Sequence, residues 1–592
     1  MAIDPKHELV GLLRRALGSV APDAADEPIH LERPREAAHG DFASNLAMRL
    51  ARRLGKNPRE LAARLLAELP LSPHVRKVEV AGAGFINFTL DDSLRREVAR
   101  QILVAGRDYG RSQAGGGQKL LLEFVSANPT GPLHVGHGRG AAYGASLANL
   151  LAFAGWDVTR EYYVNDAGRQ MDILAVSAWL RYLALCGKTL AFPPNAYQGD
   201  YVRRMAEQLR GARGERYLRP AAAVLAEVPA LPDAARNDAE AKALRERHLD
   251  VLIANARKLL GADWQVIHQH VLAEQLADGR SDLEEFGVAF DVWFSEKALF
   301  DMGLVRRSVE RLEEAGHVYL QDGAKWFRST TFGDEKDRVV QRENGIYTYF
   351  ASDIAYHANK FERGFARLIN IWGADHHGYI PRVKGALKAL GLDAERLDIA
   401  LVQFAVLYRG GQKAAMSTRS GEFVTLRALR EEVGGDACRF FYVLQKADQH
   451  LDFDLDLAQS QTSKNPVYYI QYAHARIASV LREWGGDVAE LAGADLSPLE
   501  DPREMALCAR LAAFADVIET AAAEYAPHQV AFYVKDLAAD FHAFYHHLRI
   551  LSRPDAPLAP ELQLARLALV AAVRQVIYNG MVLLGVSCPE SM

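Results

Sequence analysis

The chain has 592 residues, of which 49% are hydrophobic and 24% are charged, and its formal net charge is −5. This length predicts about three domains with sizeable cores, and no apolar run reaches the length expected of a membrane span. The four cysteines lie far apart, which argues against a disulfide framework or a local zinc site and favours a reducing cytoplasm. The small negative charge neither predicts nor excludes nucleic-acid binding, because local patches matter more than the total.

Residues 1–113 are typical of a small α/β unit. Its first 18 residues predict an amphipathic helix with acidic residues, not a signal peptide. A second helix is predicted to begin at Pro58, with Asn57 as its N-cap. Residues 75–90 predict two strands around a glycine-rich turn.

A strand, a turn and a helix are predicted over residues 119–155. Lys119 to Val125 is a short apolar run, typical of a buried parallel strand. Asn-Pro and Gly-Pro pairs in residues 126–132 break regular structure, and the small apolar residues after them predict a helix that ends at Gly155. Ligands bind beyond the carboxyl end of such a strand, and a helix N-terminus attracts phosphate. The sequence therefore predicts an anion or nucleotide site at this turn.

Two histidines stand at the predicted helix start. His134 and His137 are three residues apart and share one face of the first turn, where both can donate hydrogen bonds to phosphate oxygens. Gly136 leaves room for a flat ring against the backbone. The alternative is that the two histidines are helix caps or surface residues. A zinc site is not favoured, because no cysteine or third histidine stands at ligand spacing.

The rest of the chain divides into three stretches. Residues 188–260 are helical and charged and are predicted to be an insertion. The α/β pattern resumes at the apolar run Leu368 to Trp372. From about residue 462 strand signals vanish, and Asn465-Pro466 repeats the cap-and-proline helix start. We therefore expect three domains: residues 1–113, residues 114–461 with the insertion at about 188–260, and the helical residues 462–592.

Three aspartates, at 452, 454 and 456, are spaced like the start of a calcium-binding loop. Leu457 and Ser463 stand where that loop needs glycine and glutamate, so calcium is rejected. No resident metal site is predicted.

A second motif, "MSTRSG" at residues 416–421, follows about 280 residues after the histidines. Together with "HVGH" it resembles the two signature motifs of the class I aminoacyl-tRNA synthetases, H-I-G-H and K-M-S-K-S. The stretches "YYVNDAGRQM", "RENGIYTYFASDIAYH", "GADHHG", "NPVYYIQYAHARI" and "GVSCPESM" narrow the resemblance to the arginyl-tRNA synthetases, over nearly the whole chain. "HGDFASNLAMRLA" and "GAGFINF" resemble the additional domain that precedes the core in this family.

The resemblance implies both fold and reaction. The fold would be α/β, with a Rossmann-like catalytic core, an N-terminal α/β domain that meets the tRNA elbow, and a C-terminal all-α anticodon-binding bundle. The reaction would be ATP-dependent activation of L-arginine to arginyl-adenylate and transfer to the 3′ end of tRNA(Arg), releasing AMP and pyrophosphate. ATP would arrive with Mg²⁺, with no tightly bound cofactor. We expect a cytoplasmic monomer that does not bind membranes.

The resemblance also implies the nucleotide site. His134 and His137 would stabilise charge at phosphorus, Asp375 would accept hydrogen bonds from ribose hydroxyls, and His376 and His377 would lie near adenine. The alternative for Asp375, His376 and His377 is a metal site or a polar loop. The expected ATP-binding residues are Pro132, His134, Gly136, His137, Asp375, His376, Met416 and Ser417.

A substrate guanidinium is planar, always charged and rich in donors, so its pocket needs carboxylates and carbonyl-type acceptors. Tyr349 and Asp353 are four residues apart and would share a helical face. The residues alone would make Asp353 a helix-surface carboxylate. By resemblance, the arginine-binding residues are Glu123, Ser126, Asn128, Tyr349 and Asp353, and the tRNA-binding residues are Phe85, Asn87, Tyr472 and Arg476.

The second motif departs from the family pattern. Ala415 and Thr418 occupy the places where the family pattern has lysines, and the earlier Gly131 is no lysine either. We expect Arg419 to supply the missing cation for the leaving pyrophosphate, as a catalytic residue whose fork can bind two phosphate oxygens. Lys413 is the second choice. The alternative is that Arg419 only pairs with an acidic neighbour such as Glu422.

Two other functions stay open at this point. A nucleotidyltransferase can also use H-x-G-H beside a phosphate, although such chains are much shorter and lack the helical last third. A synthetase-like protein could bind RNA without catalysis, although both signature histidines are present.

Overall fold

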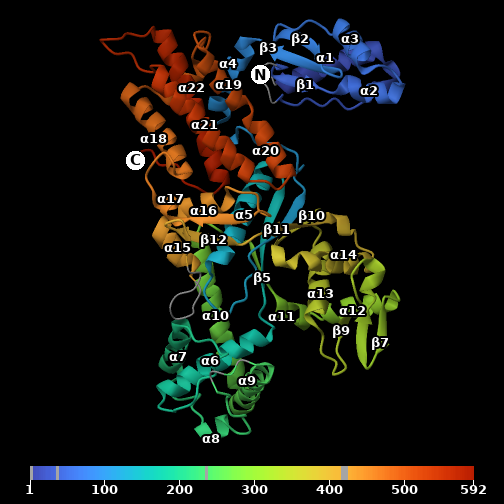
Figure 1. Ribbon diagram of the computed structural model, residues 1–592, viewed down its shortest axis with the longest axis vertical. Coiled ribbons are helices and arrows are strands. Elements are labelled where there is room, and N and C mark those ends of the chain that lie inside the picture. The colour runs from blue at the N-terminus through green and yellow to red at the C-terminus, as the bar shows by residue number, and fades with distance from the viewer. Residues whose placement is uncertain (1–4, 35–38, 234–235, 237, 415–423) are drawn as a thin grey trace.

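The computed structural model describes residues 5–34, 39–233, 236, 238–414 and 424–592. The molecule is elongated: the N-terminal domain and the C-terminal helices occupy one end, a helical insertion occupies the other, and a central sheet lies between them (Figure 1).

The N-terminal domain packs three helices on a three-stranded sheet of order β1-β3-β2. The predicted hairpin is confirmed, because β2 and β3 pair antiparallel across the glycine-rich turn. Asn57 caps α3 as predicted, accepting the N–H of Arg59 at 2.8 Å. The elements are α1 (Pro5–Val20), β1 (Phe42–Ser44), α2 (Leu46–Leu54), α3 (Pro58–Ala67), β2 (Val75–Ala81) and β3 (Phe85–Leu90).

The central sheet has five parallel strands in the order β11-β10-β4-β5-β6. From β4 the chain passes through α5 to β5 on one side, whereas from β10 it passes through α14 to β11 on the other. This reversal makes the carboxyl ends of β4 and β10 the topological switch point of the sheet, which is the usual ligand position in such sheets. The elements are β4 (Lys119–Glu123), α5 (Val135–Phe153), β5 (Asp157–Val164), β6 (Val292–Ser295), β10 (Arg367–Gly373), α14 (Ile380–Ala389) and β11 (Leu397–Val402).

Two excursions leave the sheet between β5 and β10. The first is helical and has a core of its own, contributed by residues 171–271. It comprises α6 (Arg169–Leu185), α7 (Asp200–Arg213), α8 (Ala221–Val224), α9 (Ala239–Leu260) and α10 (Ala262–Glu285). The second comprises α11 (Glu296–Asp301), α12 (Leu304–Glu314), β7 (Val318–Gln321), β8 (Ala324–Phe327), β9 (Arg338–Gln341) and α13 (Tyr349–Glu362).

After β11 a small sheet of order β13-β12-β14 and three helices connect the core to the last domain. These elements are β12 (Ala405–Arg409), β13 (Gln412–Lys413), α15 (Leu426–Val433), α16 (Gly435–Val443), β14 (Leu451–Asp454) and α17 (Leu455–Gln459). The C-terminal bundle comprises α18 (Pro466–Trp484), α19 (Pro502–Ala512), α20 (Phe514–Ala523), α21 (His528–His547) and α22 (Pro560–Leu583).

Helix α22 corrects one sequence-based statement. By length and composition it could cross a membrane, although no run of that length was expected. However, 78% of its most apolar 18-residue window is buried inside the protein. A largely buried apolar helix is typical of the core of a helical bundle.

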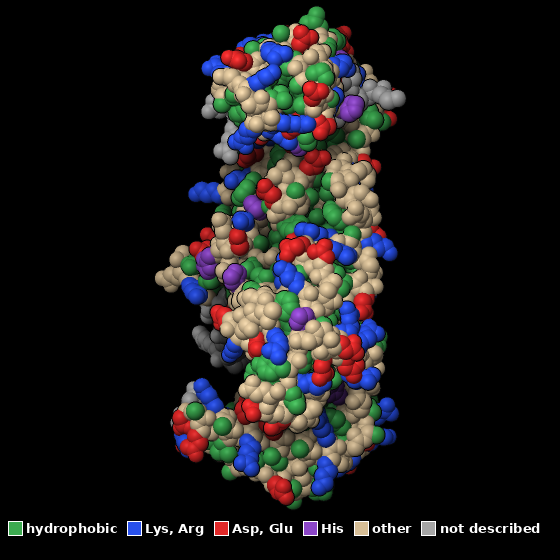
Figure 2. Space-filling view, turned by 90° about the vertical axis from the view of Figure 1, so that its right-hand side faces the viewer, with side chains coloured by type: hydrophobic (Ala, Val, Ile, Leu, Met, Phe, Trp, Pro, Cys, Tyr) green, Lys and Arg blue, Asp and Glu red, His purple; other side chains and the backbone are tan. Residues whose placement is uncertain are grey.

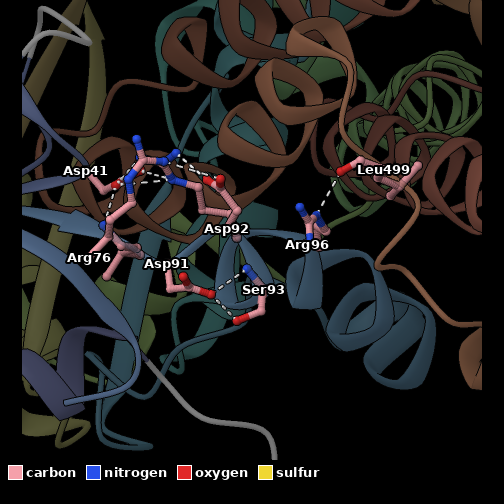
Figure 3. Close-up of polar contacts among 9 residues, drawn as sticks. Asp41, Arg76, Asp91, Asp92, Ser93, Arg96 and Leu499 are labelled. Carbon is pink, nitrogen blue, oxygen red and sulfur yellow. Dashed lines mark hydrogen bonds and ion pairs between the residues drawn. The ribbon is translucent and has the colours of Figure 1, made fainter.

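Helix α4 (Asp92–Ala105) joins the N-terminal domain to the C-terminal bundle. In its first turn Arg95 forms an ion pair with Asp41 of the N-terminal domain. One residue further, Arg96 donates to the carbonyl of Leu499 in the bundle at 2.8 Å, and Figure 3 shows both sides of this junction. Its later turns belong to the core of the bundle through Val98, Ala99 and Ile102.

Candidate active site

The backbone immediately after β4 is strained. Val125 and Ser126 have positive φ angles of 66° and 44°, which is unusual without glycine and rarest for a β-branched residue. The turn directs the Ser126 hydroxyl back to Glu123 at 3.0 Å, and the same hydroxyl accepts the N–H of Tyr163 at 3.1 Å. Glu123 and Ser126 are thereby held at the carboxyl edge of the central sheet.

His134 and His137 form a reciprocal cap at the start of α5. Nδ1 of His134 accepts the N–H of Gly136 at 3.1 Å, and Nδ1 of His137 accepts the N–H of His134 at 3.2 Å. Their rings stack with centroids 3.7 Å apart. Burial lowers the pKa of His134, and it lowers the pKa of His137 to about 3, so both rings are neutral. A neutral imidazole that accepts at Nδ1 carries its proton on Nε2, so capping makes both Nε2 atoms donors.

Gly136 is required by this cap. A Cβ atom at this position would lie 2.9 Å from the His134 ring, so a side chain would displace that ring. The space that the sequence suggested for a ligand ring is therefore partly occupied by His134. Phe404, which is 52% exposed, lies 3.5 Å from the same Cβ position and adds an apolar face beside the turn. Sequence reasoning missed Phe404, because an aromatic residue inside "LVQFAVL" is expected to be buried.

Asp375 and His376 lie at the same edge of the sheet as the capped turn. They are exposed in a short 3₁₀ turn, Ala374–Tyr379, directly after β10, as the apolar run before them predicted. Because β10 pairs with β4, the "HVGH" and "DHH" segments follow neighbouring strands. Within the described ranges, no three His, Cys, Asp or Glu side chains are arranged to hold a metal ion.

Glu123 is already paired inside the protein. The fully buried Lys360 donates to Glu123 Oε2 and also to Asn370 Oδ1 at 2.8 Å. The Lys360 ammonium also lies 4.3 Å from the centre of the Tyr356 ring. The charge of Glu123, which was predicted from the sequence to contact the substrate guanidinium, is thus neutralised by Lys360 within the protein.

Other carboxylates remain for a cationic ligand. Burial raises the pKa of Asp353 to about 7, and the Tyr379 hydroxyl donates to it. Glu296, at the start of α11, is 3% exposed, and burial raises its pKa as well. One of its oxygens has no hydrogen-bond partner among the described residues. Asp166 is satisfied by the Ser295 hydroxyl at 2.6 Å.

These acidic side chains surround a single ring. Burial raises the pKa of Tyr163, and the charges of Glu296, Asp353, Glu123 and Asp166 raise it further. Sequence reasoning missed Glu296 and Asp166, although Asp166 lies within "YYVNDAGRQM", one of the stretches that carry the family resemblance. The remaining expected arginine contacts lie on two elements. Asn128, after β4, accepts from Asn165 at 3.1 Å, and Tyr349 is 59% exposed at the first residue of α13.

The expected tRNA contacts are unevenly exposed. In β3, Phe85 is half-buried and Asn87 is only 4% exposed. In the C-terminal bundle, Arg476 lies over the rings of Tyr472 and Tyr545, 4.4 and 4.8 Å from their centres. The α21 residues Tyr545 and His542, which stacks on Tyr472 at 5.9 Å, were not foreseen. The face seen in Figure 2 mixes basic and acidic side chains.

The second motif lies outside the described residues, so the structure gives no account of Met416, Ser417 or Arg419. Its flanks are described. Lys413 is exposed at the end of β13. On the other side, the carbonyl of Val424 accepts the N–H of Val135 at 3.1 Å. The chain that follows the motif, from Val424 onward, therefore lies beside the capped histidines.

Comparisons with known proteins cover the whole chain. Residues 7–90 match the family described as the arginyl tRNA synthetase N terminal domain, residues 98–183 and 264–478 match the class I (R) tRNA synthetase catalytic domain, and residues 470–592 match the DALR anticodon binding domain. The chain is 69% identical to an arginine–tRNA ligase of Dechloromonas aromatica and 67% identical to one of Azoarcus, in each case over 100% of both chains. The fold resembles that of the Thermus thermophilus arginyl-tRNA synthetase, with a TM-score of 0.72 at 24% identity over 100% of both chains.

Proposed function

The chain belongs to the arginyl-tRNA synthetase family, and from that membership we propose how its residues divide the work of an arginine–tRNA ligase. The enzyme uses ATP to activate L-arginine as arginyl-adenylate and transfers the arginyl group to the 3′ end of tRNA(Arg). AMP and pyrophosphate are released.

His134 and His137 stabilise the charge that develops on the α-phosphate when the arginine carboxylate attacks it. The observation that carries this assignment is the reciprocal cap, which makes Nε2 of each neutral ring a hydrogen-bond donor at a helix N-terminus. Preorganised donors of this kind lower the barrier without needing to reorient during the reaction. No general base is needed, because the attacking carboxylate is already ionised.

The adenosine moiety of ATP binds between the turn after β4, which carries the capped histidines, and the turn after β10, which carries Asp375. Asp375 accepts from the ribose hydroxyls and His376 lies beside adenine, at the end of β10. On the facing side, Pro132, the backbone of Gly136 and the exposed ring of Phe404 provide a partly apolar wall. Mg²⁺ enters with ATP, and no tightly bound cofactor takes part.

Arginine is bound where acidic groups outnumber cations. Asp353 and Glu296 accept from the guanidinium, with Tyr349 at the entrance. On the β4 side Ser126 and Asn128 contact the arginine, and Glu123, whose charge Lys360 balances, contributes an acceptor oxygen rather than a net charge. The unpaired Glu296 oxygen, together with the raised pKa of Asp353, supports this assignment, because a bound cation would satisfy both groups. Lysine would be rejected because its single ammonium cannot satisfy a site built for a planar fork.

In the second motif, Met416 and Ser417 contact ATP and Arg419 steadies the leaving pyrophosphate. Lys413 is the alternative cation. The hydrogen bond between Val135, in the histidine turn, and Val424, which follows this motif in the sequence, supports the assignment.

For tRNA(Arg), we assign residues 1–113 to the elbow, with Phe85 and Asn87 as contacts. Residues 462–592 bind the anticodon through Tyr472 and Arg476. The catalytic part then spans residues 114–461 with its helical insertion. We propose that the enzyme works in the cytoplasm as a monomer.

The test is tRNA charging by the purified full chain with each amino acid. We expect arginine alone to be charged efficiently, and pyrophosphate exchange to require tRNA. Efficient charging of another amino acid without arginine would overturn the substrate assignment. Full-rate exchange without tRNA would overturn the tRNA requirement.

A further inference from the structure

Three segments that are distant in the sequence meet at Asp436, in the first turn of α16. The N–H of Ser587, in the C-terminal tail, donates to Asp436 Oδ1 at 3.0 Å, and the Ser587 hydroxyl donates to Oδ2. The side chain of Gln471, on α18, donates to the same Oδ2 at 2.8 Å and to the Ser587 carbonyl at 3.1 Å. One carboxylate therefore accepts three hydrogen bonds from the C-terminal domain.

A second residue of α16 strengthens this attachment. Arg439 is 2% exposed and donates from Nε to the carbonyl of Leu584 at 3.1 Å. The next residue, Gly585, has a φ of 68°, and a Cβ there would lie 2.3 Å from Arg439 Nη2. The chain leaving α22 is thus pressed closely onto α16, and only glycine fits at this approach.

The other end of α16 reaches the active site. The buried Tyr442 donates its hydroxyl proton to the carbonyl of Val135 at 3.0 Å. Val135 directly follows His134 in the capped turn. In the preceding helix, α15, the N–H of Leu426 donates to the carbonyl of Leu133 at 2.8 Å. Both helices that follow the second motif, α15 and α16, therefore make hydrogen bonds to the "HVGH" turn.

We propose that Asp436 is a positioning residue that sets the anticodon-binding helices relative to the catalytic histidines. Gln471 is adjacent to Tyr472. The position of a tRNA bound at Tyr472 relative to the active site is therefore set by the contacts of Gln471 with Asp436 and by α16. This inference rests on the proposed anticodon role of α18. It predicts that Asp436 affects charging only when the tRNA is held at the anticodon. Loss of this positioning would shift the 3′ end of the tRNA in the active site, and displacing a reacting group by about 1 Å can cost roughly 10²-fold in rate.

The experiment compares Asp436→Asn with the parent enzyme on two substrates: full-length tRNA(Arg), and a minihelix of the acceptor and T arms. Asparagine keeps the size but offers one acceptor oxygen to three donors. We expect kcat on full-length tRNA to fall about tenfold with its KM within about twofold, and kcat on the minihelix to stay unchanged. Ser587→Ala, which removes a single donor, should give the same pattern with a smaller fall in kcat. It replaces Asp436→Asn as the test variant if Asp436→Asn does not fold. Glu431→Gln, an equal charge change at an exposed site on α15, is the control.

If Asp436→Asn lowers kcat equally on both substrates, the proposal is overturned. It is also overturned if folded Asp436→Asn and folded Ser587→Ala keep the parent kcat on both substrates. Charging of the two substrates by the parent enzyme distinguishes a failure of this proposal from a failure of the proposed anticodon role. If the parent enzyme charges full-length tRNA no better than the minihelix, α18 does not read the anticodon. Both the anticodon role of α18 and the positioning role of Asp436 are then wrong. If the parent enzyme prefers full-length tRNA and both variants keep that preference, only the positioning role falls.

Discussion

At the start of α5, one geometry is compatible with two roles for each histidine. The cap satisfies backbone N–H groups that a helix N-terminus otherwise leaves unpaired, and it sets the tautomer that can donate to phosphate. Capping and catalysis, which stood as alternatives when only the sequence was considered, are therefore compatible.

Replacing His137 with alanine should lower turnover by roughly 10²–10³-fold with little change in the arginine KM, because a transition-state donor is lost. A modest loss of stability, about 1 kcal/mol, should accompany it as the cap is lost. Because the pKa of His137 is about 3, the defect should be the same across pH 6 to 9. Steady-state kinetics and thermal melting separate the two effects. Near-normal turnover with a lowered melting temperature would mean that His137 is only a cap.

Asp353 should make arginine binding depend on pH. Its pKa of about 7 means that the carboxylate is mostly ionised at pH 8 and mostly neutral at pH 6. Since the guanidinium binds the ionised form, the arginine KM should rise about tenfold as pH falls from 8 to 6. Asp353→Asn should give a high KM that no longer changes over this interval. A flat arginine KM in the parent enzyme would contradict the assignment of Asp353.

At the scale of the element, α18 and α21 together build a surface that neither helix has alone. Tyr472 and Arg476 come from α18, and Tyr545 and His542 come from α21. An arginine between two tyrosine rings beside a histidine is suited to stacking on unpaired bases and contacting phosphate.

Tyr472→Ala should raise the tRNA KM by about tenfold or more, since stacking of one base contributes ~1–3 kcal/mol. The KM values for ATP and arginine should not change. Phe532→Ala, on an exposed aromatic residue elsewhere on α21, is the matched control. Charging kinetics with varied tRNA concentration give the answer. An unchanged tRNA KM in folded Tyr472→Ala would remove this residue from the interface.

At the scale of the whole molecule, α4 is shared by two cores. Its first turn is paired with the N-terminal domain, and its later turns are buried in the C-terminal bundle. The orientation of the N-terminal domain is thus tied to the bundle by a continuous helix and by Lys6 and Arg33, which both pair with Asp516 on α20.

Two truncations should therefore behave differently. A chain beginning at residue 91 keeps α4 and should melt within about 5 °C of the parent's catalytic and C-terminal transition. A chain beginning at residue 106 loses the buried Val98 and Ile102, each contributing ~1.5–3 kcal/mol. It should melt roughly 10 °C lower or fail to fold. Calorimetry of both chains provides the measurement. Equal melting temperatures would show that α4 contributes little to the bundle.

The sequence by itself determined the local elements around the site. The strand predicted from Lys119 is β4, the helix predicted after the Pro/Gly turn begins at Val135, and the strand predicted from Leu368 ends at Gly373. The caps at Asn57 and Asn465 are also confirmed. Such features depend on residues a few positions apart, so turn chemistry and apolar periodicity are enough to predict them.

Only the tertiary structure decided the charge state and the partners of the site residues. Glu123 is neutralised by Lys360, 237 residues away, and Asp436 meets Ser587, 151 residues away. Glu296 and Phe404 lie in unremarkable sequence, yet one is a buried carboxylate and the other an exposed ring. Desolvation and pairing depend on which distant segments pack together. No local pattern specifies that packing, so these properties follow from the fold alone.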